Sequence, residues 1–203
     1  MTVVTNTGPL IMLAKIDQLV LLQKMFATIF IPPAVHRELM AKTGSESRRL
    51  DAALAQFIEV TVEPEIPSVV EMATQHLDEG ERQAIALAHA SGSILAIDER
   101  LGPQAARLLH LTVTGSVGLL LESKRRDYIP AVTPLLQEAP QQGYWLSDRL
   151  IVIAANLAEE SSGKLAGAWQ VGSSSVSVAH SGVCRCGRLQ GKDEGARLAI
   201  KQR

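Results

Sequence analysis

The sequence is poor in aromatic residues and has almost no cysteine. Only 3% of its 203 residues are aromatic whereas 46% are hydrophobic, so aliphatic side chains must form its core. Both cysteines, Cys184 and Cys186, lie near the C-terminus. No disulfide can therefore form within residues 1–160, which is typical of a protein from a reducing compartment. The Cys-x-Cys spacing also lacks the paired pattern of a zinc site.

Long hydrophobic runs are absent as well. The longest uninterrupted apolar stretches, such as residues 150–155, fall far short of the roughly 18 residues that a membrane span needs. The first 15 residues show neither a basic leader before their apolar part nor a small-residue cleavage pattern, so we expect no secretory signal. The sequence therefore predicts a soluble, cytoplasmic protein without a membrane partner.

Charge is unevenly distributed along the chain. The formal net charge is −1, but residues 1–160 carry −6 and residues 161–203 carry +5. The last 43 residues also hold seven of the 15 glycines and seven serines, and no apolar period continues past Trp169. We predict a folded domain over 1–160 and a Gly/Ser-rich, basic C-terminal extension over 161–203 that is poorly ordered.

Short apolar strands alternate with helical patterns through residues 1–160. Two of these strands, residues 3–5 and 94–97, end at polar residues, Asn6 and Asp98. The alternation predicts an α/β fold with a mostly parallel sheet. Further strands are expected at 28–31, 57–62 and 111–113. Helices are expected at 10–16, 17–25 (with Asp17 as N-cap), 32–40, 46–56, 68–76, 81–90, 103–109, 115–126, 130–138 and 147–160.

Four polar residues form the candidate site. In open α/β sheets, ligands bind beyond the carboxyl ends of the strands, where Asn6 and Asp98 are expected. Glu38 and Glu81, on predicted helices, would complete the cluster. Each of these four residues could instead have an ordinary structural role. Asn6 or Asp98 could cap a helix, Glu38 could be a solvated acid, and Glu81 follows Asp78 at the spacing of a capping box.

Five segments of the sequence, taken in order, resemble one family. They are VVTNTGPLIMLAKI, IPPAVHREL, LDEGERQAIALA, LAIDER and TVTGSVGLLLESKRR. Together they are similar to the PIN-domain family, and most of all to its VapC-like branch, the toxins of prokaryotic toxin–antitoxin systems. The resemblance covers about residues 2–160. It implies a three-layer α/β/α domain around a central, mostly parallel sheet.

The resemblance also implies a metal-dependent endoribonuclease. The acidic positions of the family fall on Asn6, Glu38, Glu81 and Asp98, with Glu38, Glu81 and Asp98 as ligands of Mg²⁺ or Mn²⁺. Such cations prefer oxygen ligands, acidify a bound water and neutralise the charge that builds up in phosphodiester hydrolysis. Asn6 departs from the family pattern, because an amide brings no charge and cannot act as a base.

The implied partners are RNA, a cognate antitoxin and a second copy of the chain in a homodimer. Thr7 matches the small hydroxyl residue that follows the first acidic position. The candidates for substrate contact are Thr7, Arg100, Lys124 and Arg125, with Arg48, Arg49 and Arg107 as weaker ones for the RNA backbone. The alternative function is a non-catalytic PIN-like module that binds RNA or a protein. Asn6 favours this alternative, and so does the −6 charge of residues 1–160, which opposes a broad electrostatic grip on nucleic acid.

Overall fold

The computed structural model describes residues 1–44, 46–98 and 101–160. The predicted C-terminal extension and Arg100 lie outside these residues. The strands are β1 (Thr2–Thr5), β2 (Thr28–Ile31), β3 (Ile58–Val60), β4 (Ile94–Ala96) and β5 (Val113–Thr114). The helices are α1 (Thr7–Lys15), α2 (Val20–Met25), α3 (Pro33–Met40), α4 (Ser47–Gln56), α5 (Ser68–Thr74), α6 (Glu79–Ser91), α7 (Leu101–Leu108), α8 (Ser116–Arg125), α9 (Thr133–Gln141) and α10 (Asp148–Leu157).

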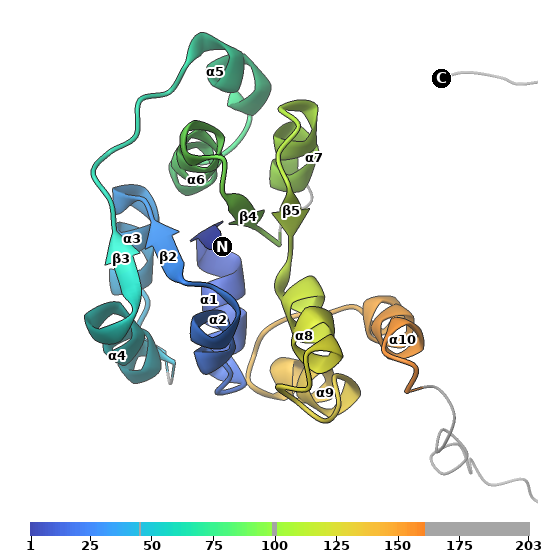
Figure 1. Ribbon diagram of the computed structural model, residues 1–203. Helices are drawn as coiled ribbons and strands as arrows, with labels where there is room; N and C mark the ends of the chain where they lie inside the picture. Colours follow the sequence, from blue (N-terminus) through green and yellow to red (C-terminus); the bar gives the residue numbers. More distant parts are fainter. Residues whose placement is uncertain (45, 99–100, 161–203) are drawn as a thin grey trace, which may run out of the picture. The chain divides into compact units, whose positions relative to one another are not determined.

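The five strands form one parallel sheet in the order β3-β2-β1-β4-β5 (Figure 1). β1 lies at the centre and pairs with β4 in a register that sets Val4 beside Leu95 and Thr5 beside Ala96. Because both strands run in the same direction, their carboxyl ends meet at one edge of the sheet. The strands that end at Asn6 and Asp98 are therefore neighbours, as the sequence predicts.

Both faces of the sheet are covered, which makes the domain a three-layer α/β/α fold. Successive residues of a strand point to opposite faces, so Val3 and Val4, both fully buried, belong to different cores. The core around Val3 includes side chains of α1, α2, α4 and α8, whereas the core around Val4 includes those of α5, α6 and α7 (Figure 1). This arrangement confirms the predicted fold class.

The predicted role of Asp17 is wrong. Asp17 adopts a positive φ of 56° and α2 begins only at Val20, with Leu19 at its N-cap. The N–H of Gln18 donates to the carbonyl of Leu13 at 2.8 Å, and that of Asp17 to Ala14 at 3.3 Å. This pair of bonds is the Schellman pattern, so Asp17 ends α1 rather than starting α2. No helix within the described ranges is long and apolar enough to span a membrane.

Candidate active site

Asn6 and Asp98 meet where β1 and β4 end. The N–H of Asn6 donates to the carbonyl of Ala96 at 2.9 Å, which extends the pairing of the two strands by one residue. Both side chains line a cleft of about 490 Å³ at this edge of the sheet. Glu38 from α3 lines the same cleft. Three of the four predicted site residues, contributed by three separate elements, therefore share one cavity.

The side chain of Asn6 does not cap α1. Asn6 occupies the N-cap position, yet its side chain makes no capping hydrogen bond. The residue is 5% exposed, and its Oδ1 is buried without a hydrogen-bond partner among the described residues. Leaving a buried acceptor unsatisfied costs about 1–3 kcal/mol. The capping role open to Asn6 is thus not realised, and its amide oxygen is available to a ligand.

The carboxylate of Asp98 is held in a fixed position by three hydrogen bonds. Oδ1 accepts from the backbone N–H of Ser116 at 2.6 Å, and Oδ2 accepts from the Ser116 hydroxyl and, at 2.8 Å, from the hydroxyl of Tyr144. Ser116 begins α8, where the helix dipole favours a negative charge. A Cβ at Gly115 would lie only 2.8 Å from Oδ1, so a glycine is needed there. A carboxylate has about four acceptor sites, and one is left for a ligand.

Glu38 is positioned by α1 and α6. The hydroxyl of Thr7 donates a hydrogen bond to its Oε2. Gly80, in the first turn of α6, lies so close that an added Cβ would collide with Oε1 of Glu38. Glu38 is therefore no freely solvated acid. The same contact explains why a glycine precedes Glu81.

Glu81 lies apart from the cleft. It is only 3% exposed, it is not part of the cleft lining, and a Cβ at Gly102 would lie 2.7 Å from its Oε1. Its backbone N–H donates to Oδ1 of Asp78 at 2.8 Å, so Asp78 caps α6 as in the first half of a capping box. In the described part of the chain, no three His, Cys, Asp or Glu side chains form a ready-made metal group.

The candidates for substrate contact are scattered. Thr7 bonds to Glu38 at the cleft, but Lys124 and Arg125 lie in the last turn of α8, about 12 Å along the helix axis from Ser116. Lys124 donates to Glu160 at 2.7 Å, and Arg125 pairs with Glu122. Hydrogen bonds from Arg125 and Arg126 lower the pKa of Glu122 to about 2. The structure therefore does not bring Lys124 and Arg125 to the cleft.

Sequence reasoning missed three polar or charged residues of the cleft lining: Lys42, Asp78 and Tyr144. Lys42 brings a cation and Tyr144 binds Asp98, while Asp78 adds a carboxylate beside its capping role. Tyr144 follows α9 in a segment with no recognisable pattern, so only the folded chain shows its role. The capping-box spacing did reveal Asp78, but as a cap and not as part of the cleft.

We compared the sequence with protein families and curated proteins, and the structure with solved structures. The DUF3368 family of PIN domains matches residues 2–160. No curated protein matches the sequence. Among solved structures, a PilT N-terminus domain protein, SSO1118, from the hyperthermophilic archaeon Sulfolobus solfataricus P2 is similar at 17% identity, with a TM-score of 0.43. The similarity covers 61% of this chain and 93% of that one.

Proposed function

The chain belongs to the PIN-domain family, and from this premise we propose that it is a metal-dependent endoribonuclease that uses Mg²⁺ or Mn²⁺. The members of this family are generally nucleases, which supports a nuclease kind of function. RNA as the substrate and the identity of the metal are parts of the proposal.

One observation carries this proposal. The buried Oδ1 of Asn6 has no hydrogen-bond partner among the described residues, and Asn6 lines a cleft that Glu38 and Asp98 also line. Two carboxylates and an amide oxygen are the oxygen donors that Mg²⁺ and Mn²⁺ prefer, and Mg²⁺ keeps several of its own waters. The donor set of the cleft therefore fits a hard divalent cation, with Asn6, Glu38 and Asp98 as the groups that would hold it.

Each residue of the cleft has a defined task in this proposal. A bound divalent cation would supply an acidified water and neutralise negative charge on the phosphate. Ser116 and Tyr144 orient Asp98, and Thr7 orients Glu38. The ammonium of Lys42, exposed at the cleft, attracts the phosphate of the substrate. Glu81 does not line the cleft and is given no contact with the cation here.

We further propose that the protein is the toxin of a toxin–antitoxin pair, acts in the cytoplasm as a homodimer and is held inactive by a cognate antitoxin. This part of the proposal rests on the resemblance of the five segments to VapC-like toxins. Co-purification of the full-length chain with the product of a neighbouring gene, together with its mass in solution, tests both partners.

Cleavage of structured RNA by the full-length protein with Mn²⁺ tests the nuclease. We expect Asp98→Asn and Glu38→Gln to lower the rate at least a hundredfold, because each removes a charged donor from the cleft. Exposed acids far from the cleft supply the matched controls, Asp51→Asn on α4 and Glu71→Gln on α5, which should cleave like the unaltered protein. Equal cleavage by the site variants and their controls would show that this cleft does not catalyse the reaction.

A second candidate function is a non-catalytic module that binds RNA or a protein. Two observations favour it: Asn6 brings no charge to the cleft, and no three acidic side chains of the described ranges are arranged around a common point. Calorimetric titration with Mn²⁺ distinguishes the two functions. Saturable binding that Asp98→Asn abolishes supports the nuclease, whereas no binding at millimolar Mn²⁺ supports the module.

A further inference from the structure

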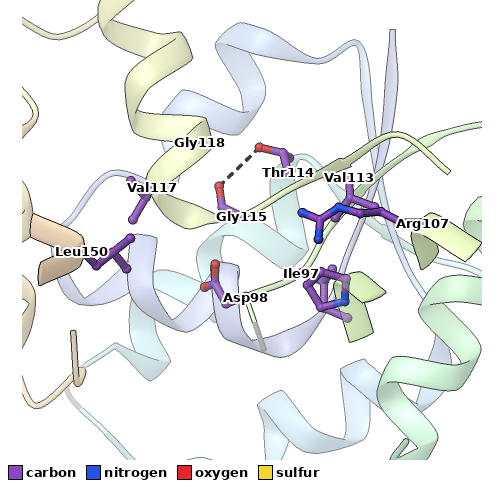
Figure 2. Close-up of a pocket in the computed structure, with 10 residues that line it drawn as sticks. Ile97, Asp98, Arg107, Val113, Thr114, Gly115, Val117, Gly118 and Leu150 are labelled. Atoms are coloured by element: carbon purple, nitrogen blue, oxygen red, sulfur yellow. Dashed lines mark hydrogen bonds between the residues drawn. The ribbon is translucent and has the colours of Figure 1, made fainter. Parts of the chain in front are cut away.

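A second cavity has Asp98 in its wall. It encloses about 400 Å³ between β4, β5 and α8, within the size range of small-molecule sites. Figure 2 shows Asp98 near its centre, with Val117 and Leu150 on one side and Ile97, Val113 and Arg107 on the other. The cavity thus combines apolar side chains with one carboxylate and one guanidinium.

Two glycines of the cavity wall pack closely against other residues of that wall. A Cβ at Gly118 would lie 2.6 Å from Oγ1 of Thr114, and one at Gly115 would lie 2.8 Å from Oδ1 of Asp98 (Figure 2). Neither glycine has a positive φ, so no backbone conformation requires them. What they provide is close approach: α8 begins directly against Thr114 and Asp98, with the side chain of Val117 beside them in the cavity wall.

Arg107 is a cation without a partner among the described residues. It lies in the last turn of α7, is exposed, and makes no ion pair or side-chain hydrogen bond within the described ranges. By contrast, Arg49 bonds to Asp17 and to the carbonyl of Ala14, and Arg48 lies on α4 beside β3, at the opposite edge of the sheet from β5. The sequence predicted Arg48, Arg49 and Arg107 as weak candidates for contact with the RNA backbone. Of these three described residues, only Arg107 lines a cavity that Asp98 also lines.

We infer that this second cavity binds one nucleotide of the RNA, with its base against the apolar side chains and its phosphate at Arg107. Apolar walls suit the faces of a base, and a guanidinium suits a phosphate because it can donate two parallel hydrogen bonds. Because Asp98 belongs to both cavities, the bound nucleotide lies next to the phosphodiester in the cleft. The inference rests on the proposed function and adds a subsite that reads the neighbouring base.

RNA binding without metal tests the cationic half of the subsite. We measure the affinity of the full-length protein for a short single-stranded RNA by fluorescence anisotropy in EDTA at several salt concentrations. Arg107→Ala should weaken binding about tenfold. It should also make the slope of log affinity against log salt shallower by about 0.7, the value for one phosphate contact to a single strand. Arg107→Lys should restore the slope, and Lys24→Ala, at an exposed position on α2, should change neither quantity.

A substitution that fills the cavity tests the apolar half. Leu150 lines the cavity and is 36% exposed, so Leu150→Trp should fit without disturbing the core. In an abasic scan, one base of the RNA is removed at a time. The unaltered protein should bind less tightly than it binds intact RNA when the base at one particular position is missing. Leu150→Trp should abolish that difference. Leu157→Trp, on the same helix and 68% exposed, should preserve it.

The outcomes separate this inference from the proposed function. One outcome is that the RNA is cleaved with Mn²⁺, but the unaltered protein, Arg107→Ala and Leu150→Trp all bind it equally well. This result would overturn the subsite and leave the proposed nuclease function standing. The cavity would then suit an apolar side chain of a protein partner. RNA bound with the expected salt and abasic effects but never cleaved would overturn the nuclease and leave the subsite.

Discussion

At the scale of single residues, Asn6 affects the electrostatics of the cleft more than its shape. An amide oxygen occupies the same space as a carboxylate oxygen and can contact a cation. It does not repel Glu38 or Asp98 when the cleft holds no cation. With Asp at position 6, three carboxylates would gather in and around a buried position, which is costly without a counter-ion. Under the proposed function, Asn6 would thus exchange metal affinity for stability of the metal-free protein.

The variant Asn6→Asp tests this exchange. Without metal it should lower the melting temperature, because a nearly buried carboxylate joins two others. With Mn²⁺ it should raise metal affinity at least tenfold over the unaltered protein, as calorimetry would measure. Gln23→Glu, which adds a carboxylate at an exposed position on α2, is the control and should change neither quantity. A destabilised variant that Mn²⁺ does not rescue would show that residue 6 does not contact the metal.

At the scale of elements, α6 shows how both ends of a helix are specified by sequence. Asp78 caps its first turn next to Glu81, and Gly92 ends it with a φ of 61° in the left-handed region. Nothing lies within 4 Å of where a Cβ on Gly92 would be. Any cost of a side chain there is therefore a cost of backbone conformation.

Gly92→Ala isolates this backbone cost. We expect a loss of about 1 kcal/mol in the free energy of unfolding, measured by urea denaturation, because alanine disfavours a positive φ. Gly92→Asn should lose less, since asparagine tolerates this region better. Mn²⁺ affinity should be unchanged in both variants, because it is the N-terminal end of α6, not the end at Gly92, that lies beside the cleft. A loss as large for Asn as for Ala would point to a cause other than conformation.

The elements also show what sequence could and could not predict. Strand–helix alternation located the described strands and helices to within a few residues, and it placed Asn6 and Asp98 at one sheet edge. The prediction that Asp17 is an N-cap was wrong, because Asp is favoured both at N-caps and in left-handed turns. Tyr144 could not be found, because its hydrogen bond to Asp98 spans 46 residues without a local pattern. Whether Glu81 joins the cleft depends on the packing of α6 against Gly102, which no spacing encodes.

At the scale of the whole domain, Glu160 connects the last described residues to two distant segments. Its carboxylate accepts from Lys124 at the end of α8, and from the backbone N–H groups of Val132 and Thr133 at the start of α9. Burial raises the pKa of Glu160, but these hydrogen bonds outweigh it and lower the pKa to about 2. The ionised carboxylate of Glu160 therefore links the last described residues to the end of α8 and to the start of α9.

This pKa predicts how stability depends on pH. A carboxyl whose pKa falls from 4.5 to about 2 on folding stabilises the folded state above pH 4.5, and the benefit disappears as the pH falls toward 2. Glu160→Gln should thus cost roughly 2 kcal/mol of unfolding free energy at pH 7 and almost nothing at pH 2. Urea denaturation across this range measures both values. The exposed Glu159→Gln serves as control, and a cost independent of pH would contradict the ionic role.

Asp98 has one carboxylate and belongs to two cavities, so whatever occupies one cavity acts on the other. Thermodynamic linkage makes this effect reciprocal: if a nucleotide beside Arg107 tightens cation binding by some factor, the cation tightens nucleotide binding by the same factor. If both cavities are occupied as proposed, metal affinity would not be a fixed property of the metal ligands. It would instead depend on the sequence of the RNA strand, so the protein would hold its cation best when the preferred base is already in place.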